Sequence, residues 1–244
     1  MLPGNLLIRI GIFLLLLGMV FVIHEHGHMR EFQKQGIAVE EFSIGIGPAA
    51  YQYQTADGMT VSLRIIPVAA YVKPTEAGGD IFLAQATRSE RLAVYLAGIR
   101  NHLFFAVAGL LILQLLGWRK GNLTTREFAY QALCTPVKLM QRAGAFYLGC
   151  LTFGQVNKVD STLLSTGRIH PPPWLGIFIA LNIGFAFFNI LPIPGLDGYK
   201  VFVALGVIDE SLLSEIPRWL VGALIGGFVA LANLQDLRMF ETQS

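Results

Sequence analysis

The stretch IGIFLLLLGMVFVI-HEHGH, residues 10–28, decides the fold of this chain, because a long apolar run leads directly into a cluster of histidines. Residues 10–23 contain no charged or amide side chain. His24 and His28 lie four residues apart, so on a helix they project from the same face, one turn apart. The stretch predicts a helix that is apolar enough to enter a membrane and carries a polar centre near one end.

The composition is that of an integral membrane protein. Of the 244 residues, 54% are hydrophobic and only 14% are charged, whereas soluble domains carry about 25% charged residues. The formal net charge of +2 and the absence of a Lys/Arg tract argue against a nucleic-acid partner. The first apolar run leads into the histidines without a small-residue cleavage site, so we expect a retained helix rather than a signal peptide.

Apolar segments recur along the chain and predict a polytopic α-helical membrane protein with about four to six transmembrane helices. A weaker segment at 139–153, interrupted by polar residues and glycines, either spans the bilayer or lies at its interface. Lys and Arg occur in the loops on both sides, so the orientation stays open. We expect one domain over residues 1–244, with its main helices at about 6–29, 92–118, 174–198 and 217–234.

The segment 37–73 has the pattern of strands instead. Apolar residues alternate with small or polar ones from Phe42 to Ile46 and again from Met59 to Ile65, which is typical of strands. Asp57-Gly58 between these runs favours a hairpin. The segment therefore predicts a small, membrane-associated antiparallel sheet. Because open sheet edges cannot face lipid, we expect it at the interface or enclosed by helices, facing the histidines.

The string His24-Glu25-His26-Gly27-His28 has the spacing of a zinc-hydrolase motif, with two ligands on one helical face and an acid beside them for proton transfer. Catalytic zinc requires a third protein ligand. Asp197 is the best candidate, because it is an isolated acid in an apolar segment that prolines and glycines interrupt. We therefore predict one Zn²⁺, held by His24, His28 and Asp197, with Glu25 as the catalytic base.

These motifs resemble those of the site-2 protease family of intramembrane zinc metalloproteases. The family pattern H-E-x-G-H is matched at residues 24–28, and N-x-x-P-x-P-x-L-D-G is matched in full at 189–198. FSIGIGP at 42–48 and IPVAAYVK at 66–73 resemble the strands of bacterial members. AGIRN at 97–101 resembles the A-G-P-x-x-N motif with a displaced spacing. The chain is similar to compact bacterial-type members without a PDZ or CBS module.

The resemblance implies hydrolysis of a peptide bond in or near the transmembrane segment of a membrane protein. It implies a single-pass substrate, such as an anti-sigma or pro-sigma regulator, and a multi-pass protein of the bacterial inner membrane. Asn189 and Asn101 become candidate contacts to a locally unwound substrate, and the sheet could pair with that substrate as an added strand. The pattern does not indicate an oligomeric state.

Two other functions stay open at this point. The chain could be a catalytically inactive membrane-binding homologue, or a metal transporter. Intact ligand motifs argue against the first, and the concentration of polar groups at one place argues against the second. His26 faces away from the two ligands on a helix, so we expect a packing or hydrogen-bonding role for it. His102 lies on an apolar helix, where it is either a satisfied buried histidine or a functional one.

Overall fold

The computed structural model describes residues 3–121, 123–134, 137–138, 141 and 173–209. The expected helix at 217–234 and nearly all of the weaker segment at 139–153 lie outside these residues. The elements that position the site are α1 (Pro3–Lys34), β1 (Val39–Gln54), β2 (Thr60–Pro74), α2 (Glu76–Gln85), α3 (Arg88–Tyr95), α4 (Ala97–Arg119), α6 (Pro173–Asn189) and α7 (Asp197–Ala204).

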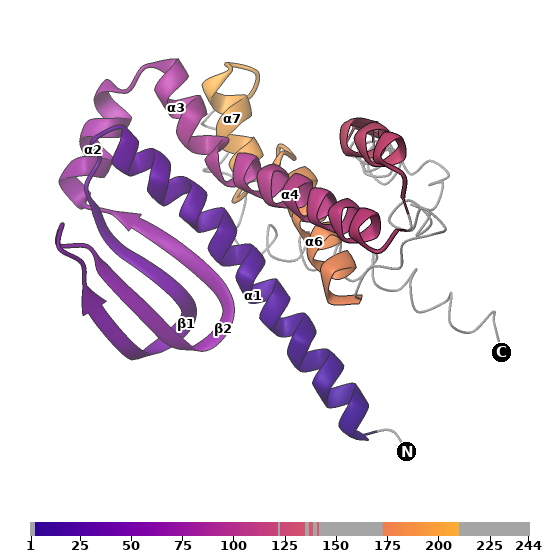
Figure 1. Cartoon of the computed structure of the whole chain (residues 1–244). Helices are drawn as coiled ribbons and strands as arrows, with labels where there is room; N and C mark the ends of the chain where they lie inside the picture. Colours follow the sequence, from indigo (N-terminus) through magenta and orange to yellow (C-terminus); the bar gives the residue numbers. More distant parts are fainter. Residues whose placement is uncertain (1–2, 122, 135–136, 139–140, 142–172, 210–244) are drawn as a thin grey trace.

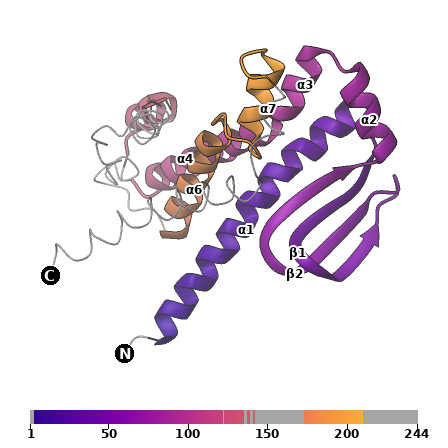
Figure 2. The same cartoon turned by 180° about the vertical axis from the view of Figure 1, so that it is seen from behind.

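Helix α1 is the central element of the described structure. In Figure 1 it runs diagonally, with the sheet on one side and α3, α4, α6 and α7 on the other, and Figure 2 shows the same arrangement from behind. Its N-terminal half extends past the other elements and exposes apolar side chains, including Phe13, Leu15 and Met19. Such an apolar helix surface, which the other described elements leave exposed, is suited to contact with lipid.

Two helices among the described residues are long and apolar enough to cross a membrane, namely Gly11–Lys34 within α1 and Ala97–Arg119. The prediction of apolar helices in the first two segments is thereby confirmed. Helix α6 contributes a shorter apolar stretch, Trp174–Asn189. It packs against α4 through a buried cluster that includes Leu110, Leu113 and Ile179. The number of membrane spans remains a prediction.

The hairpin expected at Asp57-Gly58 is confirmed. β1 and β2 pair antiparallel on either side of it, and Gly58 adopts a positive φ of 85° that glycine tolerates well. The hairpin also folds back on itself, because Ser43 pairs with both Tyr71 and Ser62. The first part of β1 therefore lies between the two ends of β2.

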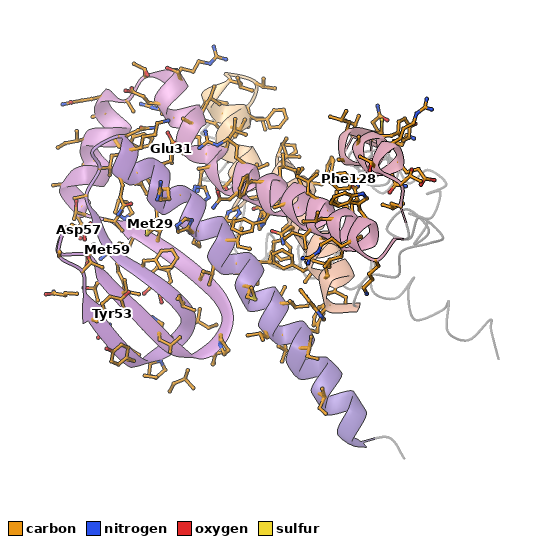
Figure 3. All side chains as sticks on the ribbon, viewed as in Figure 1. Met29, Glu31, Tyr53, Asp57, Met59 and Phe128 are labelled. Atoms are coloured by element: carbon orange, nitrogen blue, oxygen red, sulfur yellow. The ribbon has the colours of Figure 1, made fainter. Side chains whose placement is uncertain are left out.

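The sheet packs on α1 through its apolar face and carries a polar network on the other. Phe42 and Val72 belong to a cluster with Met29 of α1, and Figure 3 shows Met29 on the side of α1 next to the sheet. On the polar face Glu41 accepts hydrogen bonds from Ser62, Tyr71 and Arg64, and Ser43 accepts from Arg64. Burial raises the pKa of Glu41, but these hydrogen bonds outweigh it and hold the pKa below its usual range. The network links three separated parts of the bent hairpin.

The structure divides two of the expected helices. The segment 92–118 contains a boundary at Leu96, where α3 ends and α4 begins. A capping box of Thr87 and Glu90 fixes the start of α3. The segment 174–198 is interrupted at 190–196, between α6 and α7. The second break was expected from its prolines, whereas residues 92–96 contain neither proline nor glycine.

Candidate metal centre

Three side chains from α1 and α7 bring their ligand atoms together. Asp197 Oδ2 lies 2.9 Å from the Nε2 atoms of both His24 and His28, and these two nitrogens lie 3.1 Å apart. All three side chains are buried. Among the described residues, these three side chains form a group that could hold a metal ion. We call His24, His28 and Asp197 the metal-competent group. The structure thus joins positions that are 169 residues apart in the sequence.

The break between α6 and α7 aims Asp197 at the histidines. The chain leaves α6 in a tight turn, and Gly195 adopts a positive φ of 96°. Asp197 is then the first residue of α7. Gly198 has no room for a side chain, because a Cβ there would lie 2.3 Å from the carbonyl carbon of Ile190. Because Gly198 has no side chain, α7 can start directly against the end of α6.

The donor set fits a cation. His28 Nδ1 lies 2.9 Å from the carbonyl oxygen of Val94, which can only accept a hydrogen bond, so Nδ1 carries the proton. The Nε2 atom of a neutral His28 therefore presents a lone pair to the Asp197 carboxylate, an arrangement that a cation stabilises. Tetrahedral zinc with bonds of about 2.0–2.1 Å separates its ligand atoms by roughly 3.3 Å. The observed separations of 2.9–3.1 Å are close to this value.

Glu25 lies between the metal-competent group and the sheet. It follows His24 on α1 but remains partly exposed. The main-chain N–H of Val72, near the end of β2, donates to its Oε2 at 3.2 Å. Its carboxylate is therefore held next to the histidines by a strand, and the residue keeps partial exposure. A group that is to exchange protons with water requires such access.

Two glycines allow α1 and α4 to approach closely behind the histidines. A Cβ on Gly27 would lie 2.5 Å from the carbonyl oxygen of Ala97. A Cβ on Gly98 would lie 2.4–2.7 Å from three atoms of the His24 ring. The glycine of the first motif and that of the 97–101 segment thus meet in one contact. Gly98 provides the surface against which the His24 ring packs.

The two asparagines predicted as site residues bind main-chain carbonyls. Asn101 donates its amide N–H to the carbonyl oxygen of Ile23 at 2.8 Å, and Asn189 donates to that of Phe185 at 3.0 Å. His26 is exposed, and its Nδ1 lies 3.4 Å from the amide nitrogen of Asn101. The structure therefore brings Asn101 and His26 together at the contact between α1 and α4.

Sequence reasoning missed several polar neighbours of the centre. Lys200, one turn after Asp197, places its Nζ 3.5 Å from Asp197 Oδ1 and over the Tyr95 ring at 5.9 Å from the centroid. Asn182 is fully buried in α6 and contacts His102. Asn182 could have been noticed as a polar amide within an apolar segment, which is a functional signal in membrane proteins. No sequence pattern could have identified the Val94 carbonyl.

Comparison with known proteins also indicates a family of metalloproteases. The model of Peptidase family M50 matches residues 12–234. A protein of Enterococcus faecalis V583, named as a protease, is 33% identical over 89 residues, which are 36% of this chain and 21% of that protein. A protein of Streptococcus pneumoniae R6, named as a zinc metalloprotease, is 40% identical over 68 residues, 28% of this chain and 16% of that protein.

The aligned segments thus cover about a fifth or less of these relatives' own length. The family match covers most of this chain and includes all residues of the metal-competent group. M50 proteins are zinc metalloproteases of membranes. The chain belongs to peptidase family M50, the family of the site-2 proteases.

Proposed function

We propose that this protein is an intramembrane zinc metalloprotease that hydrolyses a peptide bond in or near the transmembrane segment of a membrane protein. The observation that carries the proposal is the convergence of His24, His28 and Asp197 within 2.9–3.1 Å, beside the carboxylate of Glu25. The three residues are the zinc ligands in this proposal. The bound metal supplies Lewis-acid activation of water and of the scissile carbonyl.

Glu25 carries the proton chemistry. Its carboxylate accepts one proton from the attacking water while the water oxygen bonds to the carbonyl carbon. The carbon–nitrogen bond then breaks, and Glu25 returns the proton to the leaving nitrogen. One water is consumed, and a carboxylic acid and an amine are formed. The N–H of Val72 holds the carboxylate in place during both transfers.

The outer edge of β2 offers a place for the substrate. A helical substrate has its backbone hydrogen bonds satisfied internally, so it must unwind and find new partners before cleavage. Val72 pairs with Phe42 on one side, and its N–H points to Glu25 on the other. Because the main-chain N–H and C=O groups of alternate strand residues face the same edge, those of Ala70 face the same edge as the N–H of Val72. An added substrate strand there would run past the catalytic carboxylate.

Asn189 and Asn101 are further substrate contacts in this proposal. Their amide nitrogens bind main-chain carbonyls, so each would offer its side-chain oxygen to an unwound substrate or exchange its present partner. The proposal includes a single domain over residues 1–244 with about four to six membrane spans. Its substrate is a single-pass protein, for which a membrane-bound anti-sigma or pro-sigma regulator in a bacterial inner membrane is the model case.

Cleavage of a fluorescently labelled single-pass model substrate tests the proposal. The full chain is loaded with zinc and reconstituted together with this substrate in liposomes. We expect cleavage that a chelator stops and zinc restores. Glu25→Gln should abolish cleavage and retain zinc, whereas Glu40→Gln, the same change at an exposed residue paired with Lys73, should cleave normally. Zinc-loaded wild type that leaves every substrate intact would identify an inactive homologue. Zinc movement across the liposome membrane without cleavage would identify a transporter.

A further inference from the structure

A buried chain of side chains leads from α6 to the metal-competent group. His102 on α4 is fully buried. Its Nε2 lies 3.1 Å from His24 Nδ1, and its own Nδ1 lies 3.1 Å from Asn182 Oδ1. Asn182 is also fully buried and donates its amide N–H to the carbonyl oxygen of Phe178 at 2.9 Å. Three helices thus contribute one connected hydrogen-bond chain.

The direction of every hydrogen bond in this chain follows from its α6 end. The Phe178 carbonyl can only accept, so it fixes the Asn182 amide with its oxygen toward His102. That oxygen also accepts only, so His102 carries its proton on Nδ1 and has a lone pair on Nε2. His24 must then donate from Nδ1, because the facing atom is an acceptor. The remaining lone pair of His24 is on Nε2, which faces Asp197 and His28.

We propose that His102 and Asn182 are positioning residues that fix the tautomer and ring orientation of His24 for metal binding. The proposal rests on the proposed function in one respect, namely that His24 is a ligand. In this proposal the Nδ1 of His24 donates to the side chain of His102, whereas the Nδ1 of His28 donates to the main-chain carbonyl of Val94. Outer partners of ligating histidines typically change metal affinity by about 10–100-fold when they are removed.

Packing confines the His24 ring to this orientation. Gly98 lies against one side of the ring, with no room for a Cβ, and the His102 ring lies at a centroid distance of 5.1 Å. An apolar residue in place of His102 would leave the buried Nδ1–H of His24 without an acceptor, which costs free energy. The ring could then rotate or change tautomer, and either change removes the Nε2 lone pair from the centre.

The test is the zinc dissociation constant of the full chain in detergent, measured by competition with a chromophoric chelator. His102→Leu should weaken zinc binding by about 10–100-fold. His102→Gln should bind nearly as wild type, because its amide oxygen can accept from His24 while its N–H donates to Asn182. Gln114→Leu is the control, since it also removes a buried polar side chain from α4 but lies outside the chain described above.

A further variant examines the α6 end of the hydrogen-bond chain. Asn182→Leu removes the acceptor for the Nδ1–H of His102 and should weaken zinc binding. The inference is overturned if His102→Leu and Asn182→Leu both bind zinc as wild type, or if His102→Gln is no better than His102→Leu. Failure of the wild type itself to bind zinc would instead overturn the proposed function. Thermal unfolding in detergent identifies any variant that does not fold. If the leucine variant at one of the two positions does not fold, the zinc affinity of the variant at the other position tests the proposal.

Discussion

Substitution of Gly98 by alanine tests the contact between α4 and the proposed zinc ligand His24. The added Cβ would lie 2.4 Å from Cε1, 2.5 Å from Nδ1 and 2.7 Å from Nε2 of the ring. An ordinary contact begins at 3.4 Å, so the ring must retreat by about 1 Å, the difference between 3.4 and 2.4 Å. A zinc site tolerates deviations of only about 0.2 Å in its ligand distances.

The cost of this change falls on metal binding. Without zinc, the His24 ring can move away from the new methyl group, whereas the bound state requires its original position. Overpacking of this kind costs about 1–3 kcal/mol. At about 1.4 kcal/mol per tenfold change in affinity, Gly98→Ala should weaken zinc binding by roughly 5- to 150-fold. Proteolytic activity at limiting zinc should fall in parallel.

Two other glycine-to-alanine variants serve as controls in the same chelator competition assay. A Cβ on Gly11 would meet nothing within 4 Å, so Gly11→Ala should behave as wild type. A Cβ on Gly109, also in α4, would lie 2.8 Å from the flexible side chain of Ile179. Gly109→Ala should therefore affect packing of α4 on α6 and leave zinc affinity unchanged. Wild-type zinc affinity in Gly98→Ala would refute the argument.

Three further changes probe other parts of the site. Gly198→Ala places a Cβ against main-chain atoms that cannot yield, so Asp197 should be displaced and the zinc content by elemental analysis should fall; full occupancy would contradict this. Arg100→Met leaves the buried Glu31 carboxylate without its 2.7 Å ion pair, so the thermal unfolding temperature should fall, and Arg100→Lys should restore part of the loss. Val72→Pro removes the N–H that holds the carboxylate of Glu25, the proposed base, so cleavage should slow at unchanged zinc affinity, and normal cleavage would count against that role.

The convergence of the side chains at the centre could be predicted from sequence because it depends on recognisable local patterns. Four-residue spacing placed His24 and His28 on one helical face, and the structure bears this out. Asp197 was found by elimination, because few acids interrupt the apolar segments. The structure brings it to both histidines. The hairpin at Asp57-Gly58 followed from turn chemistry and is present.

What could not be predicted depends on main-chain atoms and long-range packing. The Val94 carbonyl, which binds His28, has no sequence signature. The bend that lets Ser43 pair with two parts of β2 could not be read from the alternation of apolar and polar residues. The boundary at Leu96 is equally hidden, because the local sequence is apolar and lacks a helix breaker.

The segment beginning at Ala97 shows how register matters. We assigned the polar position of the A-G-P-x-x-N pattern to Asn101, with a displaced spacing. Counted without displacement, the last position of that pattern is His102. The structure places His102 against His24, whereas Asn101 donates to the carbonyl of Ile23. A one-residue difference on a helix changes the direction of a side chain by about 100°, which separates the two environments.

Zinc content per chain, measured by elemental analysis on purified wild type and on Asp197→Ala, tests the central claim most directly. We expect one zinc per wild-type chain and loss of most of it in the variant, because two histidines alone do not complete the three-ligand set of catalytic zinc. Undiminished zinc in a folded Asp197→Ala protein would contradict the claim that α1 and α7 together form the metal centre.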